Sequence, residues 1–352
     1  SMTVGVHSGD FDFFLVGASH RQLVVGGPAA SRLVELEEEA SRGRILISAE
    51  TAAALPSANV GVEEEVGIRL QGRLDPPAPT RVEFFDAHID VSRYVESEIR
   101  HAVSQGTVHS EHRTATLAFV HHRGLDDVLA EHGPEEAAAR LDALVVGVQE
   151  AIVGRTICFQ SADTGSNGGK FYLTAGVPRS TGADEEAMLL ALRDIVDLDV
   201  GVDLRAGVNS GPVFMGEIRT QHRNTFITMG DAVNLAARVT GKSRFGTVLS
   251  TQPVLDRSRT LFEETPCEPF MVKGKAKPVE ATIVGPAKGV RPGIGATDLP
   301  IVGREEELAA YAAVEADVLA GRGRFVEVVA DAGAGKSRLL DEFEVHDDRL
   351  RF

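Results

Sequence analysis

The feature that most constrains the fold of this chain is an internal repeat. The segment VGVHSG, Val4 to Gly9, is similar to RAGVNSG, Arg205 to Gly211, and ILIS, Ile45 to Ser48, is similar to VLS, Val248 to Ser250. Each copy has the same order of an apolar strand, a turn, a second strand, a glycine turn, a helix and a short strand that ends in Ser. We therefore predict two copies of one supersecondary unit.

The two copies differ in extent, because only the second is preceded by a long stretch with the periodicity of regular structure. This stretch predicts a strand, a helix after Gly124, a long amphipathic helix, a pair of hairpin strands and a further helix, over Thr116–Val120, Pro134–Ile152, Thr156–Gln160, Lys170–Ala175 and Glu185–Val196. The first copy has no counterpart. Either the chain begins in the middle of a domain, or another segment supplies the missing half.

Linker-like segments divide the rest of the chain, and its tail has motifs that the two copies lack. Asp75 to Pro79 is rich in proline and predicts a loop, and Val91 to Val103 predicts a linking helix. Gly285 to Leu299 is rich in Gly and Pro and predicts a linker. A helix opening at Ile301 follows, and then a strand, Phe325 to Ala330, that leads into the sequence DAGAGKS.

Composition excludes several classes of protein. The net charge of −16 argues against a nucleic-acid or anionic-membrane surface as the main partner. The two cysteines, Cys158 and Cys267, lie far apart without metal-ligand spacing, which favours a reducing cytoplasm over a secreted disulfide framework. We see no signal peptide and no apolar run long enough to span a membrane, and we exclude the tag-like Ser1 and Met2 from the fold.

Several motifs together resemble the class III nucleotidyl cyclases, and their layout resembles the soluble adenylyl cyclase type, with two unlike cyclase domains and a P-loop ATPase region of the AAA or STAND kind. They are EHRTATLAFV, VNSG, MGDAVNLAARV, and PIVGREEEL with AGAGKSRLL. The resemblance implies an α+β fold, with one partial and one complete ferredoxin-like cyclase domain followed by the start of an α/β P-loop domain. The expected boundaries are a carboxyl-terminal half-domain at 3–92, a linker helix at 93–111, a complete domain at 112–286, a linker at 287–300 and a truncated P-loop domain at 301–352.

The resemblance also implies an activity. In this family two cyclase domains meet head to tail with the nucleotide between them. Two aspartates on one wall hold two divalent metals, Mg²⁺ or Mn²⁺, and an Asn and an Arg on the other wall stabilise the transition state. The matching residues here are Asn234 and Arg238. We therefore expect ATP as a partner, a pseudo-dimer of cyclase domains that another chain can complete, and conversion of ATP to 3′,5′-cyclic AMP and pyrophosphate in a cytoplasmic signalling protein.

The chemistry of these residue types supports the same role. Asn234 and Arg238 stand four residues apart and project from one face of a helix. Cyclisation of ATP depends on orientation and charge stabilisation, and the planar donors of a guanidinium suit an α-phosphate better than Lys does. Asp231 is suited to cap the helix. An isolated Asn-x-x-x-Arg is usually a surface pair, but the repeat and the matching flanks favour the functional interpretation.

Both copies depart from an active pattern, in complementary ways. We align Ala30 and Val34 of the first copy with the Asn and the Arg, and neither can donate a hydrogen bond from its side chain. In the second copy His121 and Gly169 occupy the places of the two metal aspartates, and Gly offers no carboxylate. We predict one working composite site and one inactive mirror site. No metal ligand is expected in this chain, because the aspartates would precede Thr3, and we expect the chain alone to be inactive.

Two further positions concern the nucleotide. Ile227 stands three residues before Gly230, where the family usually has a polar residue that selects the purine. Because Ile cannot read a purine edge, preference for ATP over GTP depends on the subfamily resemblance alone. Lys275, within KGKAK, stands where relatives place a lysine near the triphosphate, and a solvated basic hairpin is an equally good interpretation.

The tail contains a phosphate-loop pattern, and its expected phosphate-binding residues are Gly333, Gly335, Lys336 and Ser337. Ala330 stands where the strict pattern has Gly, and too few residues follow for the acidic strand of a working ATPase. His109, His112, His121 and His122 match no common zinc spacing. Two alternatives to a cyclase stay open: a degenerate cyclase pair that senses a signal or dimerises to control the ATPase, and an NTP-driven switch centred on the P-loop.

Overall fold

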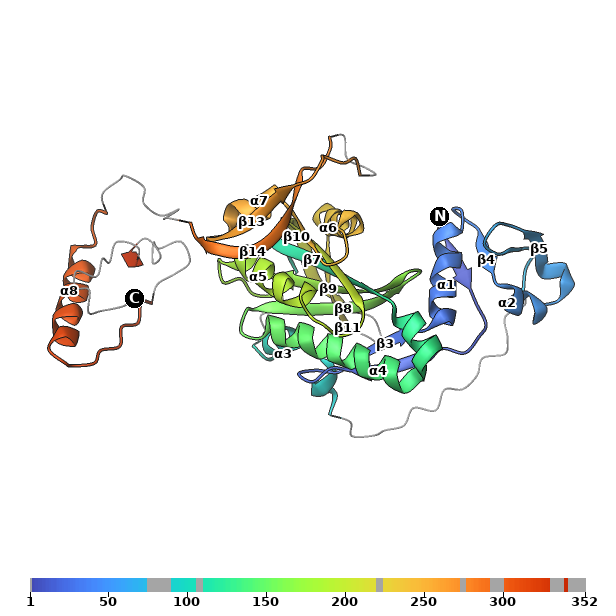
Figure 1. The fold of residues 1–352 in the computed structure, drawn as a ribbon, viewed down its shortest axis with the longest axis horizontal. Helices are drawn as coiled ribbons and strands as arrows, with labels where there is room; N and C mark the ends of the chain where they lie inside the picture. Colours follow the sequence, from blue (N-terminus) through green and yellow to red (C-terminus); the bar gives the residue numbers. More distant parts are fainter. Residues whose placement is uncertain are drawn as a thin grey trace. The chain divides into compact units, whose positions relative to one another are not determined.

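The structure is a computed structural model, and it describes residues 2–74, 90–105, 110–219, 224–272, 277–291, 301–329 and 339–340. Its contacts divide the chain into two units. The first comprises Ser1–Ser258 with Phe262–Lys288, and the second comprises Arg259–Leu261 with Gly289–Phe352. Each unit is described by itself below, and Figure 1 labels the elements.

The centre of the first unit is a βαββαβ arrangement of the ferredoxin-like kind. Its sheet has the order β10-β7-β9-β8, with all three neighbouring pairs antiparallel. This confirms the mixed α+β fold expected from the sequence. The elements are β7 (Glu111–Arg123), α4 (Leu125–Ile152), β8 (Ile157–Gly165), β9 (Gly168–Ala175), α5 (Asp184–Val196) and β10 (Asp203–Arg219).

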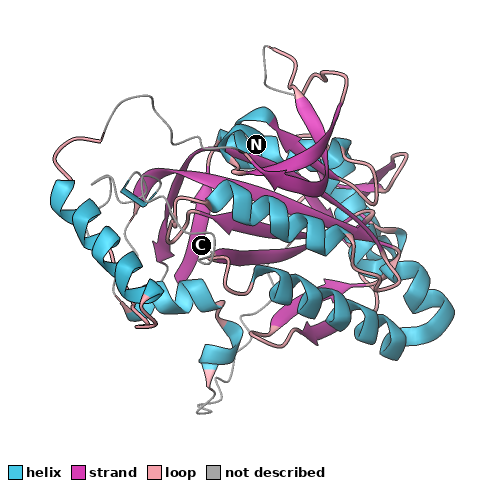
Figure 2. Cartoon of the chain, turned by 60° about the vertical axis from the view of Figure 1, so that its left-hand side comes forward, coloured by secondary structure: helices cyan, strands magenta, loops and turns pink. Residues whose placement is uncertain are grey.

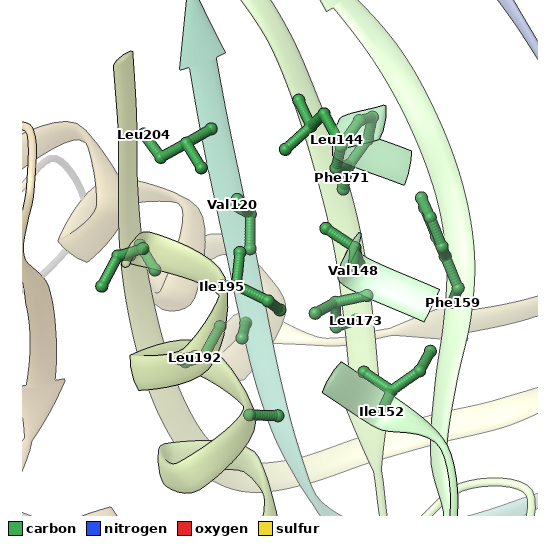
Figure 3. Packing of buried hydrophobic residues seen from close by; sticks show 14 of the residues in the cluster. Val120, Leu144, Val148, Ile152, Phe159, Phe171, Leu173, Leu192, Ile195 and Leu204 are labelled. Carbon is green, nitrogen blue, oxygen red and sulfur yellow. The ribbon is translucent and has the colours of Figure 1, made fainter. Parts of the chain in front are cut away.

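Helices α4 and α5 cover one face of this sheet (Figure 2). Leu144, Val148 and Ile152 of α4 point toward Phe171 and Leu173 of β9 in the core (Figure 3). The predicted break in α4 is confirmed, because Gly133 has a φ of 85° and Pro134 begins the longer second part. Pro lacks the N–H of a helix interior and is tolerated at the start of a helix, so this short sequence separates two helical segments.

The rest of the second copy extends the sheet and covers its other face. Strand β12 pairs with β10 in parallel, and the sheet continues through β14 to β13. Helix α6 packs through Ala232 and Ala236 on the face opposite α4. The elements are β11 (Asn224–Met229), α6 (Asp231–Lys242), β12 (Val248–Thr251), α7 (Gln252–Arg257), β13 (Thr260–Pro266) and β14 (Ala281–Val290).

The first copy repeats this arrangement on a smaller scale. Its four-stranded sheet has the order β1-β4-β6-β5, which matches β10-β12-β14-β13 strand for strand, including the parallel pairing of β1 with β4. A separate hairpin of β2 and β3 matches the pairing of β10 with β11. The elements are β1 (Val4–Val6), β2 (Asp12–Val16), β3 (Gln22–Gly26), α1 (Pro28–Glu39), β4 (Ile45–Ile47), α2 (Ala49–Ala53), η1 (Ser57–Asn59), β5 (Val60–Glu63) and β6 (Ile68–Leu70).

The helices of the two copies correspond in a register one residue away from the predicted one. The N-caps of α1 and α6 are Gly27 and Gly230, and both helices have 12 residues. A Cβ on Gly5 would lie 2.6 Å from the backbone N of Glu37, and a Cβ on Gly207 would overlap the backbone N of Thr240. Because Gly5 and Gly207 are equivalent strand residues, Glu37 matches Thr240, as the N-caps require.

The alignment of Ala30 and Val34 with the Asn and the Arg is therefore wrong. Ser31 stands at the position of Asn234, and Glu35 stands at the position of Arg238. The first copy still does not supply an Asn and Arg pair, because neither the hydroxyl of Ser31 nor the carboxylate of Glu35 has the fixed positive charge of a guanidinium.

Three other predictions need correction. The linking helix breaks into η2 (Val91–Tyr94) and α3 (Ser97–Ser104), because the Glu96 carboxylate accepts from the first N–H groups of α3 and starts a new helix. The predicted linker begins too early, since β14 continues to Val290. Residues 325–329 are not a strand, although α8 (Glu305–Leu319) does form in the second unit. Among the described helices, none is long and apolar enough to cross a membrane.

Candidate functional site

Asn234 and Arg238 lie on the outer face of α6, one turn apart. The opposite face of the helix is buried through Ala232, Ala236 and Val239, so the sequence pattern fixes which side faces outward. Asn234 is exposed and Arg238 is half-buried. Neither side chain has a hydrogen-bond or ion-pair partner within the described ranges, which leaves the amide and the guanidinium available to a ligand.

The start of α6 differs from the prediction that Asp231 caps the helix. Gly230 is the N-cap residue and makes no side-chain cap, and Asp231 is the first helical residue. A carboxylate in the first turn still interacts favourably with the positive end of the helix dipole. Asp231 therefore belongs to the helix itself.

Helix α6 packs very close to strand β10. A Cβ on Gly211 would lie 2.9 Å from the Cβ of Ala232, and one on Gly207 would overlap Thr240. Only glycine allows this approach at both ends of the helix. Between the two glycines, the buried side chain of Asn209 donates a hydrogen bond to the carbonyl oxygen of Ala232 over 3.0 Å.

The other predicted nucleotide-binding residues are only partly described. Ile227 lies on β11 opposite Gly216 of β10 and is half-buried. Its equivalent in the first copy, Val24, lies opposite Phe14 and is buried against the second copy. Lys275 lies outside the described residues, and so do the P-loop positions Gly333, Gly335, Lys336 and Ser337.

His121, at the position predicted for the first metal aspartate, is held as a neutral side chain. Its Nδ1 accepts a hydrogen bond from Nε of Arg205 over 2.9 Å, so the ring proton is on Nε2, which donates to the carbonyl oxygen of Asn167 over 2.9 Å. Burial, followed by the positive charge of Arg205, lowers the pKa of His121 to about 4. Arg205 and Arg123 both stack on the ring of Phe245.

Gly169, at the position predicted for the second metal aspartate, faces His122 across the β7–β9 pair. A Cβ at Gly169 would overlap the His122 imidazole, so the place of a second carboxylate is filled by a ring. His122 is buried, and burial followed by the neighbouring His121 lowers its pKa to about 4. A divalent metal does not fit this face, because two neutral rings and the nearby cations Arg205 and Lys170 replace the carboxylates that it needs.

The histidines singled out in the sequence are only partly described: His112 packs against Phe214, and His109 lies outside the described residues. In the part of the chain that the structure describes, no group of three or more His, Cys, Asp or Glu side chains is arranged to hold a metal ion.

The first copy covers this face of the second. The Ser31 hydroxyl of α1 donates to a carboxylate oxygen of Asp126 over 2.6 Å, and the Thr164 hydroxyl of β8 donates to the carbonyl oxygen of Val25. Ser31, Asp126 and Thr164 line a cavity of only about 20 Å³ together with His122 and Gly169. A space of this size is comparable with one water molecule and excludes a nucleotide.

The β2–β3 hairpin is anchored on α4. Phe14, Val16 and Val24 join the core of the second copy. The Gln149 side chain accepts from the backbone N of Ala18 and of Ser19, over 2.8 and 3.0 Å, and donates to the carbonyl oxygen of His20 over 2.8 Å. The two copies therefore share one hydrophobic core, and several hydrogen bonds join them, three of them made by the buried Gln149.

Sequence reasoning gave no role to Asn209, Thr251, His122 or Gln149. Asn209 lies within the VNSG motif, and its sequence signal is a polar residue that directly follows the apolar Val208. His122 is next to the predicted position His121, and only the pairing of β7 with β9 reveals that it fills the space beside Gly169. Gln149 gives no local signal, because its partners are distant in the sequence.

Comparisons with known proteins identify the second copy. The family model described as the adenylate and guanylate cyclase catalytic domain matches residues 108–285. No curated protein sequence matches the chain. Among solved structures, the guanylate cyclase domain of RhGC from Catenaria anguillulae in complex with GTP is 18% identical, with a TM-score of 0.45, over 51% of this chain and 100% of that one. The adenylyl cyclase CyaB from P. aeruginosa is also 18% identical, with a TM-score of 0.45, over 51% of this chain and 98% of that one.

Proposed function

Because the chain belongs to the adenylate and guanylate cyclase catalytic domain family, we propose that residues 112–286 form one wall of a composite site that converts ATP into 3′,5′-cyclic AMP and pyrophosphate. In this proposal residues 3–92 are the carboxyl-terminal half of a second, unlike cyclase domain. Residues 93–111 connect the two, residues 287–300 form a linker, and residues 301–352 begin a P-loop ATPase region.

One observation carries the proposal: the contrast between α6 and α1. On α6, Asn234 and Arg238 face outward and have no partner within the described ranges. On α1, the equivalent Ser31 is bonded to Asp126, and Glu35 forms an ion pair with Arg32 over 2.5 Å. An exposed amide and guanidinium are common on a helix surface, and what favours a function here is that they occupy the positions of the family's Asn and Arg in a domain that the family model matches. A catalytic wall needs such groups, because its donors must be free to meet the substrate.

The proposed mechanism is orientation with charge stabilisation. The Asn234 amide would hold the ribose so that the 3′-oxygen is in line with the α-phosphorus. The Arg238 guanidinium would neutralise the charge that develops on the α-phosphate as the bond to pyrophosphate breaks. Mg²⁺ or Mn²⁺ would supply the remaining positive charge at the phosphates. Since His121 and Gly169 do not fit a metal, its carboxylate ligands would come from another cyclase domain.

Several finer points of the proposal depend on the resemblance to soluble adenylyl cyclases. ATP is chosen over GTP on that ground alone, because Ile227 offers no polar group to a purine. Lys275 would approach the triphosphate, and Asp231 would help to shape the nucleotide-binding end of α6. Gly333, Gly335, Lys336 and Ser337 would bind phosphate in the P-loop region. The protein would act in cytoplasmic signalling.

The test is an assay of the complete gene product, with residues 1–352 as the comparison. We expect the complete product to form cyclic AMP and pyrophosphate from ATP with Mn²⁺, and residues 1–352 alone to form little. Binding of ATP by the complete product without release of pyrophosphate would exclude the enzyme.

The second candidate is a cyclase-like pair that senses a signal or dimerises and controls the P-loop region. The filled face around His122 favours it, because this face is packed and leaves no space for a nucleotide. It predicts that ATP hydrolysis by the P-loop region responds to substitutions between the two copies, such as Gln149→Ala, while Arg238→Ala has no effect.

A further inference from the structure

Asn209 links three elements through its side-chain amide. Its Nδ2 donates to the carbonyl oxygen of Ala232, in the first turn of α6, over 3.0 Å, and its Oδ1 accepts from the hydroxyl of Thr251 over 2.9 Å. The side chain is only 4% exposed. Because a backbone carbonyl can only accept, the NH₂ group must face Ala232, and the amide oxygen must then face Thr251. The orientation of the amide is therefore fixed from both sides.

The use of Thr251 is unusual for its position. Thr251 is the N-cap residue of α7, where a hydroxyl normally accepts from a backbone N–H of the helix, but it makes no such cap. In the first copy the N-cap residue of α2, Ser48, does accept from the backbone N of Thr51, over 3.2 Å. In the second copy the Thr251 hydroxyl makes no helix cap and donates to Asn209 instead.

The first copy also lacks the link to the helix. The residue equivalent to Asn209 is His7, which faces Glu50 of α2, and its Nδ1 makes no hydrogen bond within the described residues. The first copy is also the one with Ser31 and Glu35 in place of the Asn and the Arg. The buried link from strand to helix and the exposed Asn–Arg pair therefore occur in the same copy.

The link restrains a motion that the close glycine contacts leave free. Gly207 and Gly211 set how near α6 lies to β10, and the buried alanines of α6 determine which face is inward, but these contacts are not directional. A hydrogen bond from Asn209 to one side of the first turn resists rotation of the helix. The bond reaches Ala232, two residues before Asn234. A small rotation of the helix about its axis would displace the Arg238 guanidinium, because this group lies at the end of a long side chain. A misplacement of about 1 Å costs about 100-fold in rate in a site of this kind.

We propose that Asn209 is a positioning residue, which holds α6 at the rotation where Asn234 and Arg238 meet the nucleotide, and that Thr251 orients its amide. This inference rests on the function proposed above for that pair.

The test uses three variants. Asn209→Asp keeps the acceptor for Thr251 and loses the donor to Ala232. Thr251→Val removes the group that orients the amide and puts no charge in the core, so it stays informative if the first variant folds poorly. Thr251→Ser keeps the hydroxyl and is the matched control. Hydrogen exchange of residues 233–236 is measured in residues 1–352, and kcat and KM for ATP are measured in the complete gene product.

We expect Asn209→Asp to lower kcat about 10- to 100-fold with KM changed less than about 3-fold, because the pair acts in the transition state. Thr251→Val should shift kcat in the same direction, and Thr251→Ser should match the wild type. Amides 233–236 should exchange faster in the first two variants, while those of β7 and β9 stay unchanged.

Two results would overturn the inference: unaltered exchange in α6, or a loss of activity that only follows the fraction of unfolded protein. If the wild-type gene product forms no cyclic AMP, the proposed function fails. The exchange measurement still decides whether Asn209 holds the helix.

Discussion

Ser31 of α1 donates a hydrogen bond to Asp126 of α4 over 2.6 Å, and this bond closes the space between the two copies of the repeat. Its equivalent on α6, Asn234, has no such partner within the described ranges. The same helix position therefore packs against the other copy in α1 and is exposed in α6. The predictions below test both roles.

Arg238→Ala should reduce cyclic AMP formation by the complete gene product by about 100- to 1000-fold, with a small change in KM. The guanidinium is proposed to act on charge that develops only in the transition state, and the loss of one such donor has about this effect. Arg238→Lys should stay far below the wild type, because an ammonium lacks the planar fork. Lys242→Ala, in the last turn of the same helix, is the control and should be nearly normal. Equal activity of the two alanine variants would contradict the assigned role.

Gln149→Ala should destabilise the first unit by about 1–3 kcal/mol, because it removes three hydrogen bonds of a buried side chain and leaves the buried carbonyl oxygen of His20 without this partner. The midpoint of urea unfolding measures this effect. Glu150→Ala, at the exposed neighbouring position, is the matched control and should cost less than about 0.5 kcal/mol. If both variants unfold at the same midpoint, the buried contact does not hold the two copies together.

Acid should weaken the fold between pH 6.5 and about pH 4. The pKa of His122 is lowered to about 4 by burial, followed by the neighbouring His121, so the unfolded chain binds a proton over this range and the folded chain does not. The stability is complete above pH 6.5 and is lost as the pH falls, by about 3 kcal/mol for this histidine. His122→Phe should flatten the dependence of the urea midpoint on pH, whereas the exposed His132→Gln should leave it unchanged. A slope that stays the same in His122→Phe would show that the ring is not shielded.

Thiol reagents should distinguish the two cysteines. Cys158 is fully buried, and burial followed by the nearby Glu96 carboxylate raises the pKa of its thiol well above the usual value. Cys267 is half-buried. A colorimetric thiol assay at pH 8 should therefore find one fast group in the native protein and two in denaturant. Cys267→Ser should abolish the fast reaction and Cys158→Ser should preserve it, and the reverse pattern would contradict the burial of Cys158.

The sequence predicts the central βαββαβ order well, because each element carries its own periodicity and its own breakers. Gly133 and Pro134 mark the break in α4 in the sequence as clearly as in the structure. The sequence alone does not determine the register of α1 against α6. Gly26 and Gly27 are adjacent, and either can be aligned with Gly230. Only the approach of Gly5 to Glu37, a contact between distant backbone segments, decides between them.

In the candidate site, too, the sequence reveals some residues and not others. Asn234 and Arg238 are visible as a helical pair because their spacing is local. The role proposed for Asn209 is not visible, since its partners Ala232 and Thr251 come together only when β10 lies beside both α6 and β12.

The overlap between Gly169 and His122 has an evolutionary consequence. A single substitution, Gly169→Asp, does not fit this packing, because the new Cβ would overlap the His122 ring and the ring would have to move. The reverse order fails as well, since a smaller residue at position 122 first opens a cavity in a packed sheet and lowers stability with no gain in activity. A carboxylate at position 169 therefore needs a second change, at position 122, and a carboxylate at position 121 would be a third. Positions 122 and 169 are coupled by packing, so we expect related chains with a larger residue at position 169 to have a smaller one at position 122.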